Sequence, residues 1–222
     1  MTTINLQKGL EALYYFDEKY LDQNDDSIGD HSGKGRRAEA SGGPTVGVPG
    51  PNDFQAASFD GIDDVIKLSD STGMPSSDNE PVTFAVRIKT YADDGANEYF
   101  FSSQGSGGFQ NNTYSLVFDA NIFGITGGDN DDYTRLRGEY NTEEWFDFVG
   151  IYDGEEFRIY FDGVFIDRTD VDVTLQDGNP DYTIKSENHS YDLAYACVWS
   201  RAISYEEIQT LNRMTAPRRA QI

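Results

Sequence analysis

The sequence is short of cysteine. Its 222 residues contain one, Cys197, which rules out an intramolecular disulfide and any zinc site built from several cysteines. Cys197 lies within an apolar run, residues 193–199, and cysteine is among the residue types most often buried. We therefore expect Cys197 to be a buried, unreactive thiol.

Basic residues are also scarce. The chain has 17 Lys and Arg against 39 Asp and Glu, a net charge of −22, and only 6 of the basic residues are Lys. Such a surface repels nucleic acids and anionic membranes, so we expect neither as a partner. The acidic residues also repel one another, and molar salt largely screens this repulsion because the Debye length falls to about 3 Å. The composition favours a protein of a salt-loving organism over an ordinary acidic protein.

Long apolar runs are absent. No stretch approaches the roughly 18 residues of a membrane-spanning helix, so we expect no membrane insertion. Residues 1–10 have no basic segment followed by an apolar one, so we expect no signal peptide. The hydrophobic content is only 37%, but 14% of the residues are aromatic, and each buried aromatic side chain removes about 150–250 Å² from water. We therefore expect a folded core and not disorder.

Tight turns and alternating strands are what the sequence does contain. Asp-Gly pairs, which tolerate the positive φ of tight turns, recur along the chain. Between them apolar and polar residues alternate, as in 82–89 and 157–161, which is typical of strands with one buried face. Further strands are predicted at 11–16, 55–60, 62–68, 97–102, 113–119, 121–126, 133–138, 145–152, 164–168, 181–185 and 192–199.

This pattern predicts an all-β fold, a two-sheet antiparallel jelly-roll sandwich with one short C-terminal helix. The helix is predicted at 204–214, because Ser204 and Glu207 form a capping box ahead of an apolar face. Residues 215–222 form a tail. The polar residues 22–53, rich in Gly and Pro, are interpreted as a surface excursion within one domain that covers residues 1–222.

Aromatic residues exceed what one strand face can hold. Tyr99, Phe100 and Phe101 are consecutive, and Trp145 and Phe146 lie close to Phe148. A sandwich strand needs only its inward face apolar. We therefore predict an outward aromatic face that is covered by a loop, by the 22–53 segment or by a partner subunit.

Several motifs carry a family resemblance. They are Gly-Leu-Glu-Ala-Leu-Tyr-Tyr-Phe-Asp at 9–17, Asp-x-Ser-Gly-x-Gly at 30–35, Ser-Phe-Asp-Gly-x-Asp-Asp at 58–64, the hairpin pair at 145–163 and the closing strand and helix at 198–208. In order and spacing they resemble the laminin-G-like/concanavalin A-like family over nearly the whole chain. The resemblance implies two antiparallel sheets packed face to face.

The same resemblance implies function only in outline. Members of the family serve as carbohydrate-binding modules, adhesion modules, virion surface domains and accessory domains of hydrolases, so the fold alone does not choose among them. One departure stands out. Many members carry Asp-Glu in the closing strand, where this chain has Ala194 and Tyr195. Any role of those acids in the family is lost here.

The sequence gives no catalytic residue. Retaining glucanases on this fold carry Glu-x-Asp-x-Glu along one strand, which aims two carboxylates at one sugar about 5 Å apart. No Glu of this chain has an Asp two residues later, so a hydrolase of that type is excluded. A carboxylate pair from different strands stays open. His31 and His189 have no evident nucleophile partner.

Clusters of Asp residues suggest a cation. Calcium takes about six to eight oxygen ligands, often from Asp on loops, and related domains hold a structural calcium at a sheet rim. We predict a structural calcium site, and no other cofactor, with ligands Asp17, Asp30, Asp60 and Asp64. The alternative is that these residues only form turns and a solvated acidic surface.

Two loops are candidates for ligand binding. Sugar-binding modules use aromatic side chains for ring stacking and amides for hydroxyl groups, and loops 104–112 and 127–133 offer both. The predicted ligand-binding residues are Phe109, Asn111, Asn112, Asp129, Asn130 and Tyr133. The alternative is a flexible hairpin tip with Phe109 tucked against the fold.

Together these observations predict a non-enzymatic binding or assembly domain. The leading hypothesis is a surface structural component of a virion of a halophilic host, assembled in the host cytoplasm, as a capsid decoration, turret, spike or fibre. Its partners would be copies of itself or other virion proteins, with a host-surface glycan as candidate ligand. The alternative is a carbohydrate-binding or adhesion module of an extracellular cellular protein, and a glycoside hydrolase is the third hypothesis.

Overall fold

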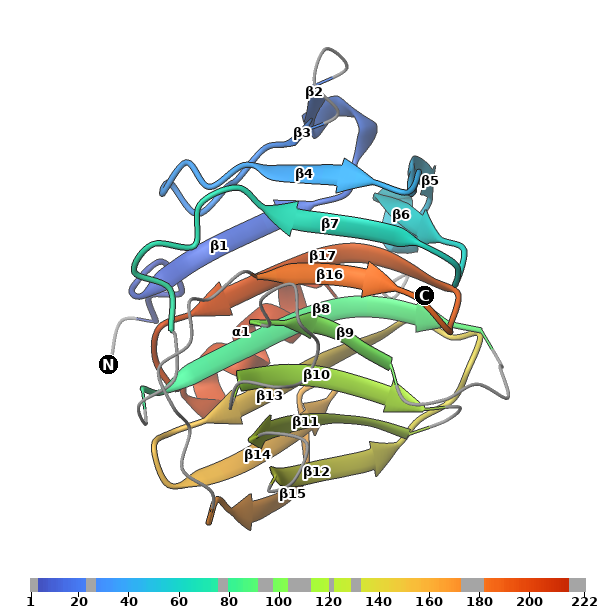
Figure 1. The fold of residues 1–222 in the computed structure, drawn as a ribbon. Helices are drawn as coiled ribbons and strands as arrows, with labels where there is room; N and C mark the ends of the chain where they lie inside the picture. The colour runs from blue at the N-terminus through green and yellow to red at the C-terminus, as the bar shows by residue number, and fades with distance from the viewer. Residues whose placement is uncertain are drawn as a thin grey trace, which may run out of the picture.

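The computed structural model describes residues 4–22, 27–75, 80–91, 98–103, 113–119, 122–128, 133–172 and 182–215. Two antiparallel β-sheets pack face to face, and Figure 1 shows them as a front and a back layer. The back sheet has the order β15-β14-β13-β8-β17-β6-β5, with β1 beside β17, and the front sheet has the order β12-β11-β10-β9-β16-β7-β4-β3-β2. The predicted jelly-roll sandwich is confirmed.

The strands of the back sheet are β15 (Val164–Asp170), β14 (Glu156–Phe161), β13 (Phe146–Tyr152), β8 (Val82–Thr90), β17 (Tyr191–Trp199), β6 (Gln55–Phe59), β5 (Thr45–Pro49) and β1 (Leu10–Tyr15). Those of the front sheet are β12 (Tyr133–Glu139), β11 (Ile122–Gly128), β10 (Thr113–Asp119), β9 (Glu98–Ser102), β16 (Thr183–Ser186), β7 (Asp64–Leu68), β4 (Ala38–Ser41), β3 (Ser27–Ile28) and β2 (Leu21–Asp22).

The central strand β8 shows how the sequence pattern fills the core. Phe84, Val86 and Ile88 point into the cluster between the sheets, whereas Ala85 belongs to a second apolar cluster on the outer face of the back sheet. Burying each large inward side chain contributes roughly 1.5–3 kcal/mol. The alternation predicted a strand with one buried face, but both faces are buried here because a helix and the N-terminal segment cover the outer one.

That helix is α1 (Tyr205–Thr215), the one α-helix among the described residues, and Figure 1 shows it behind the back sheet. The predicted capping box is present: the Ser204 N–H donates to Glu207 Oε2 at 2.8 Å, and the Glu207 N–H donates to Ser204 Oγ at 3.3 Å. Ile208 and Leu211 are buried against the outer face of the back sheet.

A β-bulge removes the outward aromatic face that the sequence predicts in β9. Leu116 pairs with Phe101 but Val117 pairs with Tyr99, so Phe100 is the extra residue of the bulge. As a result Phe100 and Phe101 are both fully buried between the sheets. In β13, ordinary alternation turns Phe146 and Phe148 inward as well. The predicted need for an external cover is therefore wrong for these residues.

Segment 22–53 is more than the predicted surface excursion. Within it β4 pairs with β7 in the front sheet, and β5 pairs with β6 in the back sheet. Ala38 is fully buried in the core. The strand pattern is weak here because small residues, Gly and Pro leave little alternation to detect, and because the pairing partners lie farther along the chain.

Candidate functional site

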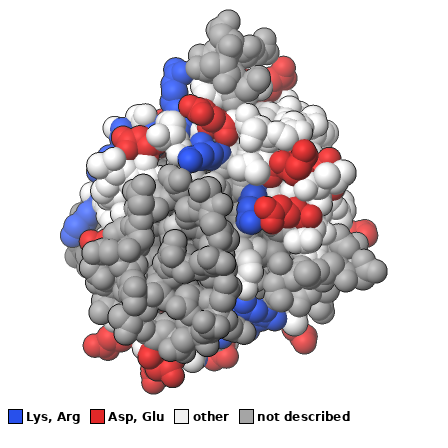
Figure 2. All heavy atoms as spheres, in the orientation of Figure 1, with Lys and Arg blue, Asp and Glu red and all other residues white. Residues whose placement is uncertain are grey.

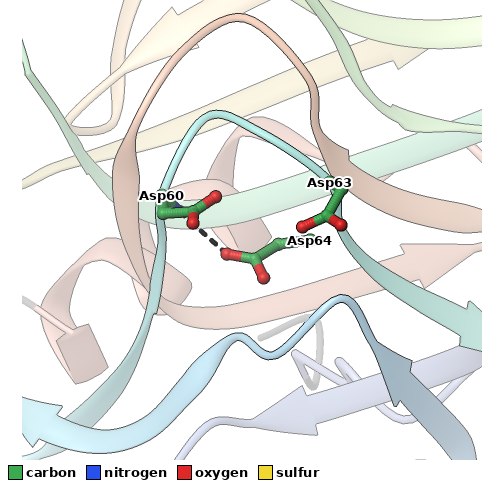
Figure 3. A group of neighbouring side chains, drawn as sticks. All are labelled: Asp60, Asp63 and Asp64. Carbon is green, nitrogen blue, oxygen red and sulfur yellow. Dashed lines mark hydrogen bonds between the residues drawn. The ribbon is translucent and has the colours of Figure 1, made fainter.

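The turn between β6 and β7 brings three carboxylates together. Asp60, Asp63 and Asp64 each offer an oxygen, and these oxygens lie within 4.8 Å of one another. Figure 3 shows the three side chains on one short turn, with Asp60 and Asp64 facing each other. The Asp60 N–H donates to Asp64 Oδ2 at 2.8 Å, and the Ile62 N–H donates to Asp60 Oδ1 at 2.9 Å. The turn leads from the back sheet to the front sheet and is not a hairpin.

Two glycines hold this turn in place. Gly61 has a φ of +85°, a conformation that favours glycine, and a Cβ there would lie 3.1 Å from the backbone of His189. A Cβ on Gly42 would lie 2.2 Å from the carbonyl oxygen of Asp63. The chain therefore packs backbone to backbone on the turn, which fixes where the carboxylates stand.

The cluster suits a hard divalent cation. Two oxygens bound to one Ca²⁺ ion at 2.3–2.6 Å are at most about 5 Å apart, which matches the spacing of the three carboxylates. Burial raises the pKa of the Asp64 carboxyl, against the hydrogen bond from Asp60, and the charges of Asp60 and Asp63 raise it further. A bound cation would relieve this repulsion. Asp63 is the member that the sequence prediction left out, although it lies within the same motif.

The other two predicted metal ligands stand elsewhere. Asp17 precedes the 3₁₀ helix Glu18–Tyr20, accepts the Lys19 N–H and forms an ion pair with the Lys19 ammonium at 2.5 Å. Asp30 organises its loop, since its carboxylate accepts the N–H groups of Leu13, Ser32 and Arg36. Neither belongs to a group of three metal-ligating side chains among the described residues.

The predicted loop residues Phe109, Asn111, Asn112, Asp129 and Asn130 lie outside the described residues, and Tyr133 begins β12. The described loops and strands do form a pocket on the outer face of the back sheet, hereafter the outer-face pocket, which the sequence did not predict. Its volume is about 370 Å³. The apolar lining residues are Leu6, Leu10, Leu13, Tyr15, Tyr20, Pro51, Phe54, Ala194, Tyr195, Cys197, Trp199, Leu211 and Met214, and the polar ones are Gln7, Asp17, Lys19, Gln55, Arg87 and Thr215.

A buried ion pair lies at the base of the outer-face pocket. Arg87 of β8 faces Asp147 of β13 on one side and Tyr195 of β17 on the other. Arg87 Nη1 donates to Asp147 Oδ2 at 2.9 Å, and the hydroxyls of Tyr195 and Thr215 donate to the same carboxylate at 2.9 and 2.6 Å. Burial raises the pKa of Asp147 to about 6, although Arg87 and the two hydroxyls oppose it.

Contacts between distant segments fix the walls of the pocket. Asn52, in the 3₁₀ helix Pro51–Asp53, donates from Nδ2 to the carbonyl of Thr215 at 2.8 Å, which ties the end of α1 to the β5–β6 connection. The Trp199 indole N–H donates to the Leu6 carbonyl at 2.8 Å and holds the N-terminal segment over the sheet. The pocket is therefore assembled from segments at both ends of the chain.

One sequence signal could have indicated this pocket. Asp147 is a charged residue at an outward position of β13, whose other outward residues, Val149 and Ile151, are apolar. A charged residue among apolar residues on the outward face of a strand predicts that another part of the chain covers this face and that the covered region has a polar centre. Cys197 is buried as expected, and burial raises the pKa of its thiol well above the usual range.

The surface carries both charge signs. Figure 2 shows one face, on which Lys and Arg side chains stand beside Asp and Glu. Arg158 and Arg201 form ion pairs with Asp153 and Glu207 at 2.6 and 2.7 Å. These two basic residues are thus matched locally, and the chain keeps its acidic excess. In the described part of the chain, α1 is too short and too polar to cross a membrane.

Comparison with known proteins supports the fold. A laminin-G family model, described as the concanavalin A-like lectin/glucanases superfamily, matches residues 60–209. No curated protein matches the chain in sequence.

Several solved structures are similar. The receptor-binding domain of botulinum neurotoxin D is 13% identical, with a TM-score of 0.74 over 95% of this chain and 54% of that one. The binding domain of Paraclostridial mosquitocidal protein 1 is 14% identical, with a TM-score of 0.74 over 95% and 53%. A botulinum neurotoxin type C structure is 12% identical, with a TM-score of 0.74 over 95% and 52%. The chain spans about half the length of these proteins, and identities this low show a shared fold alone.

Proposed function

The chain belongs to the concanavalin A-like lectin/glucanases superfamily, and we propose that it is a non-enzymatic module that binds a carbohydrate on a cell surface. The observation that carries the proposal is the outer-face pocket. Its volume of about 370 Å³ lies within the 300–1,000 Å³ typical of small-molecule sites. Most of its lining residues are apolar, five of them aromatic, and six polar side chains stand among them.

The solved structures with this fold add support. Cell entry of botulinum neurotoxin type C depends on interaction with two ganglioside molecules. Binding domains of a type DC neurotoxin form complexes with SialylT and with rat synaptotagmin II. Proteins that share this fold thus bind glycans and protein receptors. For this chain a glycan is the better match, because the pocket is small and its rings suit the C–H faces of a sugar.

The test is glycan binding by the whole chain in 2 M KCl. Phe54 and Phe165 are 49% and 47% exposed, but only Phe54 lines the pocket. We expect Phe54→Ala to lose roughly tenfold or more in glycan affinity, which corresponds to about 1.4 kcal/mol or more. Phe165→Ala should bind like the unmodified chain. A glycan array covering neutral and acidic glycans that retains no protein would overturn the proposal, and so would steady release of free sugar.

For the β6–β7 turn we propose a structural Ca²⁺ ion held by Asp60, Asp63 and Asp64. The three carboxylates supply part of the six to eight oxygens that Ca²⁺ takes, and water would supply others. The ion would join the two sheets at one corner. It would not take part in sugar binding, because none of the three residues lines the outer-face pocket.

The setting of the module remains a proposal drawn from the sequence: the surface of a virion of a halophilic host, with an extracellular cellular protein as the alternative. Homo-oligomers or other virion proteins are the proposed partners. A native mass measurement in molar salt separates the two settings. A closed oligomer supports the virion component, and a monomer at high concentration supports the isolated module.

A further inference from the structure

We infer that the outer-face pocket selects neutral saccharides over acidic ones, and that Arg87 donates hydrogen bonds to an oxygen of the bound sugar. This inference rests on the proposed function and names the class of ligand. It is carried by three features of the pocket: donors of Arg87 that the protein leaves unused, a balance of charge around them, and walls that suit a sugar ring.

Arg87 has unused donors. The residue is 4% exposed, and its Nε has no hydrogen-bond partner among the described residues. The guanidinium carries five N–H donors, and the hydrogen bond to Asp147 uses Nη1. Nε itself is enclosed by the protein, so the donors that an acceptor oxygen in the pocket can reach are the Nη N–H groups that Asp147 does not use.

The charges around the pocket are already balanced. Asp147 is 2% exposed, pairs with Arg87 and accepts hydrogen bonds from the hydroxyls of Tyr195 and Thr215, so the protein itself matches its charge. Lys19, the other basic residue of the lining, pairs with Asp17. A carboxylate or sulfate on the ligand would find no uncompensated cation, and it would approach two carboxylates on a chain of net charge −22. A hydroxyl or ring oxygen accepts a hydrogen bond from Arg87 without that repulsion.

The walls suit a sugar ring more than a lipid tail. Tyr15, Tyr20 and Phe54 contribute aromatic rings to the lining, and the exposed Gln7 adds an amide that can bind hydroxyl groups. Phe54 and Met214 stay about half or more exposed while they line the pocket, at 49% and 64%. An apolar tail favours a lining without polar groups, whereas six polar side chains line this pocket.

The experiment measures binding of lactose, maltose, cellobiose and sialyllactose to the whole chain by calorimetry in 2 M KCl at pH 7. In this salt the repulsion of an acidic sugar by the acidic surface is screened, so a difference in affinity reflects contacts within the pocket. At least one neutral disaccharide should bind at least tenfold more tightly than sialyllactose. Arg87→Lys keeps the charge and the ion pair but loses the forked donors, and we expect at least a tenfold loss of affinity for the neutral sugar.

Arg36 provides the matched control. It is also buried, pairs with the carboxylate of Glu11 and has an unpartnered Nε, but it does not line the pocket. Arg36→Lys should bind sugar like the unmodified chain. Unchanged affinity in Arg87→Lys, or sialyllactose binding as tightly as every neutral sugar, overturns the inference and leaves the proposed function standing. Binding of no glycan by the unmodified chain, on the array as well as in solution, overturns both.

Discussion

The buried ion pair of Arg87 and Asp147 should be costly to break from the basic side. Arg87→Met leaves the Asp147 carboxylate buried without a counter-charge at pH 7, and breaking a buried ion pair in this way costs about 3–5 kcal/mol. Replacing both residues, as Arg87→Met with Asp147→Leu, removes the unpaired charge and should cost less than the single change. Urea unfolding in 2 M KCl measures both. A single variant as stable as the double variant would contradict the argument.

Asp147 also predicts a pH dependence. Burial raises its folded pKa to about 6 from the ordinary value of 3.8, so between these values the folded state holds a proton that the unfolded state has lost. The contribution of this residue to stability therefore falls as pH rises from about 4 to about 6, by about 3 kcal/mol in total. Unfolding curves across this range should show the fall in the unmodified chain but not in the Arg87→Met, Asp147→Leu variant. An equal dependence of the unfolding free energy on pH in the two proteins would refute this prediction.

Glu207, at the start of α1, predicts the opposite pH dependence of stability. Arg201 lowers the pKa of Glu207 through hydrogen bonds, so the stabilisation by Glu207 is present above its ordinary pKa of about 4.5 and is lost as pH falls through the lowered value. We expect Glu207→Gln to destabilise the fold by about 1–2 kcal/mol at pH 7, because it loses the ion pair and weakens the capping box. Glu206→Gln, in the same turn but exposed, is the control for helix-dipole effects. Equal melting temperatures for the two variants would argue against this role.

The β6–β7 turn predicts a response to calcium. If Ca²⁺ binds the folded state, a concentration a hundred times the dissociation constant adds about 2.7 kcal/mol, and each kcal/mol raises the melting temperature by about 2–4 °C in a chain of this size. Asp63→Asn should abolish the rise, whereas the exposed Asp170→Asn should retain it. Differential scanning calorimetry with CaCl₂ or chelator, both in 2 M KCl, makes the comparison. A rise that survives in Asp63→Asn would mean that this turn is not the site.

Elements with regular alternation were predictable, and those defined by their partners were not. The alternation in β8 and the capping box of α1 are local signals, so the sequence places both elements. β4 and β5 carry no such signal, because their strand character comes from pairing with β7 and β6. The bulge at Phe100 depends on the register with β10, which no local pattern specifies.

The candidate sites divide in the same way. Asp60 and Asp64 lie four residues apart on one turn, so the sequence brings them together, and Asp63 joins them for the same reason. The outer-face pocket needs α1 to fold back onto strands far earlier in the chain. Thr215 reaches Asp147 across 68 positions, and Trp199 reaches Leu6 across 193. Only the three-dimensional structure reveals contacts of this kind.

At the scale of the whole molecule, charge should govern stability. The net charge is −22, because 39 acidic residues stand against 17 basic ones, so more than half of the acidic charge has no basic counterpart. The Debye length is about 10 Å at 0.1 M salt and about 3 Å at 1 M, so repulsion between neighbouring acidic patches is screened only at high salt. We expect the melting temperature to rise by roughly 10 °C between 0.1 M and 2 M KCl, which corresponds to a few kcal/mol of relieved repulsion.

A charge-reduced variant separates this screening from the general strengthening of apolar burial by salt. Glu39, Glu155, Asp170 and Glu206 are exposed, and changing all four to the corresponding amides reduces the net charge from −22 to −18. If repulsion is the cause, this variant melts higher than the unmodified chain at 0.1 M KCl, and the difference shrinks toward zero at 2 M because salt has already screened the charges. If the salt effect comes only from stronger apolar burial, the melting temperatures of the two proteins should rise in parallel with KCl concentration. A melting temperature of the unmodified chain that stays flat or falls with KCl would exclude adaptation of this surface to high salt.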